Sequence, residues 1–277
     1  AVGIVLLRHP QGTSARPLPP ATHAPRGATR ADLRADGLRG RWSVSQSSLL
    51  AHGARSVYAT LDLTAEAPER SAARRPVAIA VVMDTSGSMD GEKISQAREA
   101  VRSLVDRMGH DDRVAFVTYS DQTRVVQPLG RVADVREAMQ HVIPTIVAAG
   151  GTMIPAALEA GARALDEAPA GFVRRVVLIS DGQDGSGIPL PAVQASVRAR
   201  ASQGVTLSSL GIGADYQEAF LSGVADAGRG NYEFLRDGAQ LQAFLSRELE
   251  QASSTTIERA VATVDLPTGW RLARAYG

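Results

Sequence analysis

Three separated segments of the sequence carry hydroxyl and carboxylate side chains that could together bind a metal ion. Residues 84–88 read Asp-Thr-Ser-Gly-Ser, and alternate residues of an extended or looped backbone can point the same way, so Asp84, Ser86 and Ser88 can converge. Thr152 follows two glycines at the start of a predicted helix, where its hydroxyl either caps the helix or turns to the metal, and Asp181 ends an apolar run. Hard oxygen donors of this kind suit Mg²⁺, Mn²⁺ or Ca²⁺ and argue against zinc or copper.

The elements that must position these side chains are short apolar runs that alternate with amphipathic segments of helical length. The runs show no polar alternation, which predicts strands covered on both faces, as in a parallel sheet with helices on either side. We therefore predict an α/β fold with a doubly wound, mostly parallel, Rossmann-like sheet flanked by helices. The predicted strands are Val77–Met83, Val114–Tyr119, Val176–Ser180, Val205–Leu210 and Tyr232–Leu235, and the predicted helices are one between the first two strands and others at 132–142, 153–167, 191–203, 215–227 and 238–252.

The candidate ligands follow the predicted strands at the edge where such sheets bind ligands, outside the carboxyl ends of the strands. Asp84 follows directly on the first strand. Asp181 follows the third, and its carboxylate joins the same crevice if the two strands are neighbours.

This pattern of residues, Asp84-x-Ser86-x-Ser88 followed by Thr152 and Asp181, resembles the metal-ion-dependent adhesion site of von Willebrand factor type A domains. The resemblance covers roughly residues 76–250, and the stretches around Asp84 and Asp181 look most like bacterial relatives of inter-α-trypsin-inhibitor heavy chains. It implies a binding module rather than an enzyme. The five residues would hold a divalent cation, Mg²⁺ with Mn²⁺ or Ca²⁺ as alternatives, with the serines in direct contact and the two aspartates acting partly through water.

Charge arithmetic supports the same mechanism. Asp84 and Asp181 supply two negative charges against the two positive charges of the metal, so an Asp or Glu from a protein partner completes the site with a favourable Coulomb term. A net charge of +1 over 277 residues gives no global field that would attract nucleic acid. We expect a protein partner, and neither nucleic acid nor a small-molecule substrate. The plainer alternative is that Ser86, Ser88 and Thr152 serve only as caps and turn formers.

Enzymatic chemistry is disfavoured at these positions. A phosphatase of the haloacid dehalogenase type would carry a second Asp where this chain has Ser86, so its general acid is missing. The chain has no cysteine, its histidines are scattered, and no G-x-S-x-G occurs. Lys93 is the only lysine and does not follow a glycine directly, which excludes a P-loop.

The segments outside the α/β pattern differ in composition. We predict a leader and linker over 1–41, flanking β-strands over 42–72, the type A domain over 73–252 and the start of a C-terminal β segment over 253–277. Strict alternation at Val57–Thr64 predicts a half-buried strand, and Pro267-Thr268-Gly269 indicates a hairpin turn. These flanking strands could pair into a small β unit.

Localisation has two interpretations, and the type of partner has further alternatives. The apolar run Ala1–Leu7 is either the tail of a signal peptide or anchor, or a strand; we expect an exported protein, with a cytoplasmic one as the alternative. The resemblance also leaves open a subunit that works beside an AAA+ ATPase in intracellular metal insertion or complex remodelling. A third interpretation is a scaffold whose metal stabilises only its own loops.

Several charged or bulky residues near the motif are predicted to have structural roles. We predict that Asp90 and Asp184 cap helices, with tuning of the metal as the alternative for both. We predict that Met89 and Tyr119 pack in the core, with a position at the rim of the site as the alternative. The pairs Arg74-Arg75 and Arg174-Arg175 precede apolar runs and are predicted to be solvated strand ends.

Overall fold

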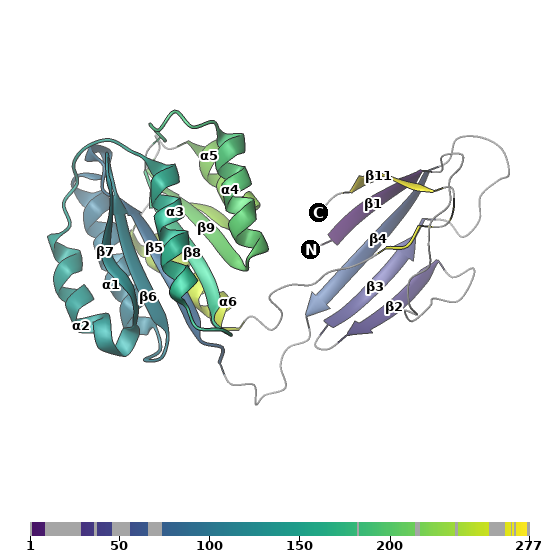
Figure 1. The fold of residues 1–277 in the computed structure, drawn as a ribbon, viewed down its shortest axis with the longest axis horizontal. Helices are drawn as coiled ribbons and strands as arrows, with labels where there is room; N and C mark the ends of the chain where they lie inside the picture. Colours follow the sequence, from purple (N-terminus) through teal and green to yellow (C-terminus); the bar gives the residue numbers. More distant parts are fainter. Residues whose placement is uncertain are drawn as a thin grey trace. The chain divides into compact units, whose positions relative to one another are not determined.

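A computed structural model describes residues 2–8, 29–35, 38–45, 56–65, 74–181, 183–213, 217–235, 238–254, 264–266, 268 and 270–275. The chain divides into two compact units (Figure 1). One comprises Ala1–Ala72 together with Thr256–Gly277 and is called the β unit here; the other comprises Ala73–Thr255 and is called the α/β unit. Within the described residues, no helix combines the length and apolar character needed to cross a bilayer.

The α/β unit is built on a six-stranded sheet with the strand order β10-β9-β8-β5-β6-β7. All neighbours are parallel except β7, which runs antiparallel to β6, so the predicted mostly parallel sheet is confirmed. Every residue of the central strand β5 is buried, as the apolar run Val77–Met83 predicts, and its last residue, Asp84, is buried as well. The strands are β5 (Val77–Asp84), β6 (Arg113–Tyr119), β7 (Thr123–Arg131), β8 (Val173–Ser180), β9 (Val205–Ile212) and β10 (Arg229–Leu235).

Helices cover both faces of this sheet because alternate residues of its strands face opposite ways. Ile79 and Val81 pack with α1, α2 and α6 on one face, and Ala80 and Val82 pack with α3, α4 and α5 on the other (Figure 1). The predicted helices are confirmed with small shifts at their ends; residues 215–216 of one predicted helix lie outside the described residues. The helices are α1 (Glu92–Arg107), α2 (Val132–Val142), α3 (Ile154–Ala164), α4 (Leu190–Ser202), α5 (Glu218–Ala227) and α6 (Gly238–Ser253), with 3₁₀ turns η1 (Gly87–Met89), η2 (Ile143–Thr145) and η3 (Leu165–Glu167).

The β unit contains a five-stranded antiparallel sheet with the order β11-β1-β4-β3-β2. In β4 the predicted alternation is present at its start, where Val57 and Ala59 are buried and Tyr58 is 53% exposed. The flanking strands do pair, because β1 lies between β4 and the C-terminal β11. The strands are β1 (Val2–Arg8), β2 (Arg30–Ala35), β3 (Leu38–Val44), β4 (Ser56–Ala65) and β11 (Arg271–Ala275).

Two predictions in this part of the chain need correction. The segment 1–41 is predicted as leader and linker, but it contains β1, β2 and the first half of β3. For the apolar run Ala1–Leu7, the alternative prediction of a strand agrees with the structure over residues 2–7. The ladder partners of β1 lie far along the chain, so no local pattern reveals that pairing, whereas β2 pairs with β3 directly after it. The second arm of the predicted hairpin is a strand, β11, but it pairs with β1. In the predicted first arm, residues 264–266 form no strand, and residues 260–263 lie outside the described residues.

Candidate metal centre

The parallel register of β5 and β8 brings two of the predicted ligands to the same edge of the sheet. Met83 of β5 is paired with Ile179 of β8, so Asp84, the last residue of β5, and Asp181, directly after β8, lie at adjacent carboxyl ends. The condition set by the sequence, that the two strands be neighbours, is therefore met.

A chain of hydrogen bonds joins four of the five predicted ligands. The Ser86 amide donates to Asp84 Oδ1 at 2.8 Å, the Ser86 and Ser88 hydroxyl oxygens are 3.0 Å apart, and the Ser88 hydroxyl donates to Asp181 Oδ1 at 2.8 Å. Asp84, Ser86 and Asp181 are almost completely buried, whereas Ser88 is exposed. The cluster therefore opens to solvent on the side of Ser88.

The loop that carries Thr152 lies against the loop of residues 84–88. The Gly87 amide donates to the carbonyl oxygen of Gly150 at 2.9 Å, and the carbonyl oxygen of Thr152 accepts from the Gly185 amide at 2.7 Å. Met153 is the N-cap of α3, so Thr152 is not its cap. The structure brings the loop of Thr152 to the site; no hydrogen bond is seen between its hydroxyl and the other four predicted ligands.

The two glycines before Thr152 accommodate a carboxylate that the sequence motif does not include. The Gly151 amide donates to Asp121 Oδ1 at 2.9 Å, and a Cβ on either Gly150 or Gly151 would collide with the Asp121 carboxylate. Gly150 also has φ +84°, a conformation that side chains disfavour. Asp121, in the turn between β6 and β7, thus helps to hold the Thr152 loop in place.

Two buried hydroxyl groups donate hydrogen bonds to the carboxylate of Asp84. Ser180 donates to Asp84 Oδ2 at 2.9 Å and the Tyr119 hydroxyl donates to the same oxygen at 3.2 Å. Burial raises the pKa of Asp84 above its ordinary value, an effect opposed by the hydrogen bonds from Ser86 and Ser180. Burial likewise raises the pKa of Tyr119 well above its ordinary value, so this phenol remains a proton donor. Tyr119 packs in the core as predicted, and in addition it orients Asp84.

The only lysine of the chain adds a cationic group to the cluster. Lys93 Nζ lies 2.5 Å from Asp181 Oδ2 and donates to the carbonyl oxygen of Ser88 at 3.2 Å. The sequence gives no signal for this contact beyond the uniqueness of the lysine. The side-chain ammonium group of Lys93 thus places a positive charge directly against Asp181, at the edge of the cluster.

The chemistry of the donors fits a hard divalent cation. Two carboxylates and three hydroxyl groups come from the three segments, and no group of three or more His, Cys, Asp or Glu side chains suited to a metal occurs among the described residues. A cation bound here would therefore have ligands rich in neutral hydroxyls, which is compatible with Mg²⁺, Mn²⁺ or Ca²⁺.

Comparison with known proteins identifies the family of the α/β unit. A family model described as the von Willebrand factor type A domain matches residues 78–247. The chain belongs to this family. Type A domains typically mediate protein–protein interaction or adhesion.

The type A domain has relatives in bacteria and in animals. The chain is 30% identical over 199 residues to the protein YfbK of Escherichia coli, a match that covers 68% of this chain and 33% of YfbK. It is 31% identical over 183 residues to inter-alpha-trypsin inhibitor heavy chain H4 of Bos taurus, covering 61% of this chain and 20% of that protein. The chain thus spans a third or less of the length of these relatives.

Solved structures agree with this fold. A von Willebrand factor type A protein from Catenulispora acidiphila superposes with a TM-score of 0.66 at 27% identity, covering 80% of this chain and 52% of that one. Proximal thread matrix protein 1 from the mussel byssus superposes with a TM-score of 0.53 at 20% identity, covering 65% of this chain and 46% of that one.

Two aspartates near the site of this type A domain have different outcomes. Asp184 Oδ1 accepts a hydrogen bond from the amide of Ile154, the first residue of α3, at 3.1 Å, so it bonds to the start of that helix although Met153 occupies the N-cap position. The prediction that Asp90 caps α1 is wrong, because the N-cap is Gly91 and no side-chain cap bond is present. Gly91 takes φ +80°, and the chain enters the helix through that turn instead.

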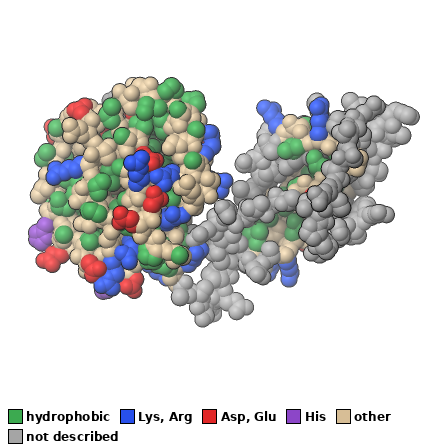
Figure 2. Space-filling view, in the orientation of Figure 1, with side chains coloured by type: hydrophobic (Ala, Val, Ile, Leu, Met, Phe, Trp, Pro, Cys, Tyr) green, Lys and Arg blue, Asp and Glu red, His purple; other side chains and the backbone are tan. Residues whose placement is uncertain are grey.

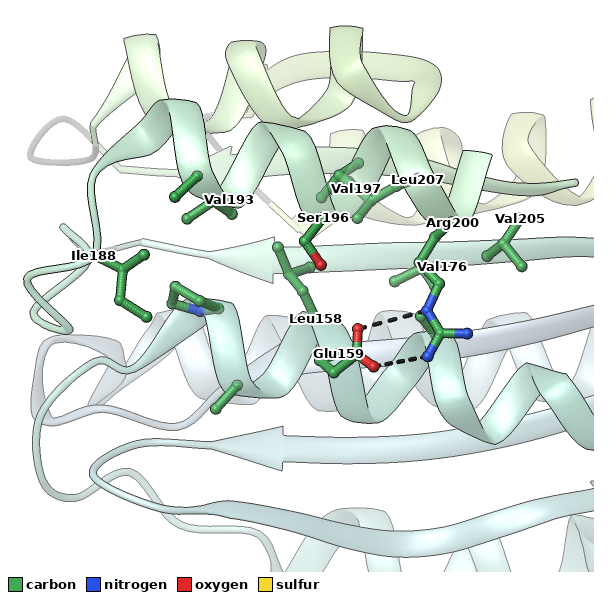
Figure 3. Close-up of a pocket in the computed structure, with 14 residues that line it drawn as sticks. Leu158, Glu159, Val176, Ile188, Val193, Ser196, Val197, Arg200, Val205 and Leu207 are labelled. Atoms are coloured by element: carbon green, nitrogen blue, oxygen red, sulfur yellow. Dashed lines mark hydrogen bonds and ion pairs between the residues drawn. The ribbon is translucent and has the colours of Figure 1, made fainter. Parts of the chain in front are cut away.

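The type A domain also has an apolar groove between α3 and α4, with a volume of about 310 Å³ (Figure 3). Leu158, Val193 and Val197 contribute to its lining, and Glu159 and Arg200 lie at one end. These two side chains are paired with each other at 2.7 Å, so the charges at this end are already satisfied. The groove shares no residue with the metal-site cluster and offers no comparable set of converging oxygens.

Proposed function

We propose that this type A domain is a divalent-cation-dependent protein-binding module. Asp84, Ser86, Ser88, Thr152 and Asp181 would hold Mg²⁺, with Mn²⁺ or Ca²⁺ as alternatives, and the metal would hold an Asp or Glu carboxylate of a protein partner. The observation that carries the proposal is the continuous chain from Ser86 through Ser88 to Asp181, which is buried at its carboxylates and open at Ser88. The opening lies where a partner group can reach the metal.

The charge of the site supports a carboxylate as the partner group. Two aspartates balance the charge of a divalent cation, and the hydroxyl ligands are neutral. An additional anion therefore retains a favourable interaction with the metal, whereas a site with three or four carboxylates would repel it. Basic and acidic side chains are interspersed over the face of the α/β unit seen in Figure 2, so that face has no extended basic surface for nucleic acid.

The surroundings of the cluster support binding rather than catalysis. His110 and His141, the two histidines within the described residues, are exposed and lie outside the cluster. The position two residues after Asp84 is a serine that is bound to Ser88, so it supplies no general acid. We therefore propose that the domain is not an enzyme.

Related structures support an adhesive function outside the cytoplasm. The mussel byssus protein is described with a zinc-occupied MIDAS motif, and a pilus adhesin, SpaC from Lactobacillus rhamnosus, superposes with a TM-score of 0.53 at 15% identity. An aerotolerance-related membrane protein from Bacteroides fragilis superposes with a TM-score of 0.51 at 20% identity. We propose on this basis that the chain acts at the cell envelope or beyond it.

The proposal is tested by calorimetric titration of the purified chain with Mg²⁺ and with Mn²⁺. We expect one saturable site that is lost in Asp181→Ala. The matched control is Asp226→Ala, which removes an exposed carboxylate near the end of α5, away from the carboxyl edge of the sheet, and should leave binding unchanged. Absence of saturable binding to the unmodified chain, or equal loss in both variants, would refute the metal site.

The carboxylate-binding step has its own test, with acetate as the probe. Bound Mn²⁺ accelerates the relaxation of nearby protons, so acetate methyl protons should relax faster with the Mn²⁺-loaded chain, and acetamide, which is neutral, should show little effect. Equal relaxation of the two probes would contradict capture of a carboxylate by the metal.

A further inference from the structure

We propose that Lys93 is a built-in counter-ion of the metal site, which lowers the affinity for the cation and makes the loaded site positively charged. The inference rests on the proposed function and adds a residue that the motif does not contain. Lys93 would act through its charge and would not be a ligand of the metal.

The contacts of Lys93 place its charge at the cluster. Its ammonium group bonds to Asp181 Oδ2, while the other oxygen of the same carboxylate accepts from Ser88. The Asp181 side chain is fully buried and the Lys93 side chain is 31% exposed. The ammonium group therefore lies between the buried carboxylate and solvent, on the open side of the cluster.

The backbone directly after β9 lies close to the end of the Lys93 side chain, where a glycine leaves room for it. Gly213 has φ +83°, and a Cβ built there would come within 3.1 Å of Lys93 Cε and 3.3 Å of its Nζ. At the other end, Lys93 is the second residue of α1 and is anchored by that helix. A bound metal would displace the ammonium group from Asp181, and the anchorage of Lys93 on α1 would keep its charge near the site.

The charge balance gives Lys93 two opposite effects. Counting the groups in contact with the cluster, Asp84, Asp181 and Lys93 sum to −1 without metal and to +1 with a divalent cation. Without the ammonium group the same sums would be −2 and 0. Lys93 therefore opposes binding of the cation, and it strengthens the attraction of the loaded site for an anionic partner group.

A purely structural role of Lys93 predicts the opposite result for the cation. If the ion pair served to hold Asp181 in its metal-binding position, its removal would weaken metal binding. If Lys93 is a counter-ion, its removal strengthens metal binding. The sign of the change in affinity therefore distinguishes the two roles.

The test is calorimetric titration with Mg²⁺ of the unmodified chain, Lys93→Met and Lys93→Gln. We expect the dissociation constant for Mg²⁺ to fall by about fivefold or more in both variants, the effect of one unit charge at close range even in a water-like dielectric. The second variant retains a donor for Asp181 and covers the case in which the apolar side chain disturbs the loop. Thermal unfolding of each variant without metal verifies that it is folded.

The matched control is Arg107→Gln, which removes one positive charge from the exposed last residue of the same helix, about 21 Å from Lys93 at 1.5 Å per residue. It should leave the Mg²⁺ affinity unchanged. A second control, Lys93→Arg, retains the charge and should retain weak binding. Unchanged or weaker Mg²⁺ binding in Lys93→Met and Lys93→Gln would overturn the counter-ion role, whereas absence of binding to the unmodified chain would overturn the proposed function as well.

The predicted effect of Lys93 on the binding of a carboxylate is measured with acetate and the Mn²⁺-loaded chain. Lys93→Met should bind Mn²⁺ more tightly and acetate more weakly than the unmodified chain. Equal or tighter acetate binding in the variant would overturn this half of the inference.

Discussion

The two ends of strand β8 each hold an ion pair, and the pairs differ in how completely their charged groups are enclosed. At the start of the strand, Arg175 bonds to Glu248 of α6 at 2.8 Å, and their side chains are 10% and 2% exposed. Ser208 donates to Glu248 Oε2, and Asn231 donates to Oε1, both at 2.6 Å. After the end of the strand, Asp181 is equally buried, but its partner Lys93 is 31% exposed.

This difference indicates two functions for two pairs of the same formal charge. The Arg175 guanidinium also bonds to the carbonyl oxygen of Glu248 and to Thr206, so its planar donors are engaged on several sides and fasten α6 to the sheet. Lys93 carries a compact charge on a flexible stem at an opening. The first pair is enclosed on both sides. Under the proposed function, the second pair would be rearranged by a competing cation. Burial of the carboxylate alone does not distinguish them, whereas accessibility of its cationic partner does.

The largest effect that separates the two regions is expected from Asp181→Asn. The substitution retains the shape of the side chain but removes the negative charge that offsets the cation. We expect loss of saturable Mg²⁺ binding with a cooperative unfolding transition, measured by calorimetry and circular dichroism. Retention of Mg²⁺ binding at normal affinity would show that Asp181 is not part of a metal site.

The corresponding change at the start of β8 is Glu248→Gln, which should lower the stability of the fold and leave Mg²⁺ binding intact. It leaves the buried Arg175 charge unpaired, which typically costs about 3–5 kcal/mol of unfolding free energy. For a domain of this size that corresponds to a decrease in melting temperature of roughly 10 °C. The Mg²⁺ affinity of the folded protein should be unchanged. A stable variant that loses metal binding would contradict the division between the two ends.

The sequence predicts features that depend on neighbouring residues better than contacts between residues that lie far apart in the chain. The apolar runs and the motif residues are local signals, and they predicted β5, β8 and the adjacent positions of Asp84 and Asp181. Arg175 was predicted to be solvated and is buried, because its partner Glu248 lies 73 residues further along the chain. Ser180 and Lys93 were missed for the same reason, since each acts on a carboxylate from another segment.

The edge strand β7 shows a second reason why the sequence alone does not predict every element of the fold. Strand β7 has mixed polar residues and a proline, and its side chains are intermediate or exposed, so it lacks the apolar run that predicts the central strands. It is held by its ladder with β6, which no local pattern reports. The assignment of Asp84, Ser86, Ser88, Thr152 and Asp181 as metal ligands is a prediction that the Mg²⁺ and Mn²⁺ titrations test.

A smaller effect is expected from Tyr119→Phe, which tests the support behind the metal site. It removes one donor to Asp84 Oδ2 and leaves the bonds from Ser180 and Ser86 in place. Loss of a group that orients a ligand commonly weakens metal binding by 10- to 100-fold, and we expect about tenfold here because two donors remain. Tyr58→Phe makes the same chemical change at an exposed residue of the β unit and should have no effect on Mg²⁺ titrations.

The smallest effect is expected from Glu159→Gln at the apolar groove, where a third ion pair is partly exposed. The hydrogen bond from Arg200 lowers the pKa of Glu159 below its ordinary value of 4.5, assisted by Arg163. Because the folded carboxyl is the stronger acid, its contribution to stability is present above pH 4.5 and is lost as the pH falls through the folded pKa. We expect at most about 1 kcal/mol, decreasing at high salt, from denaturant unfolding of both proteins across this range. If Glu159→Gln were as damaging at neutral pH as Glu248→Gln, accessibility would not be what separates a fastening pair from an exchangeable one.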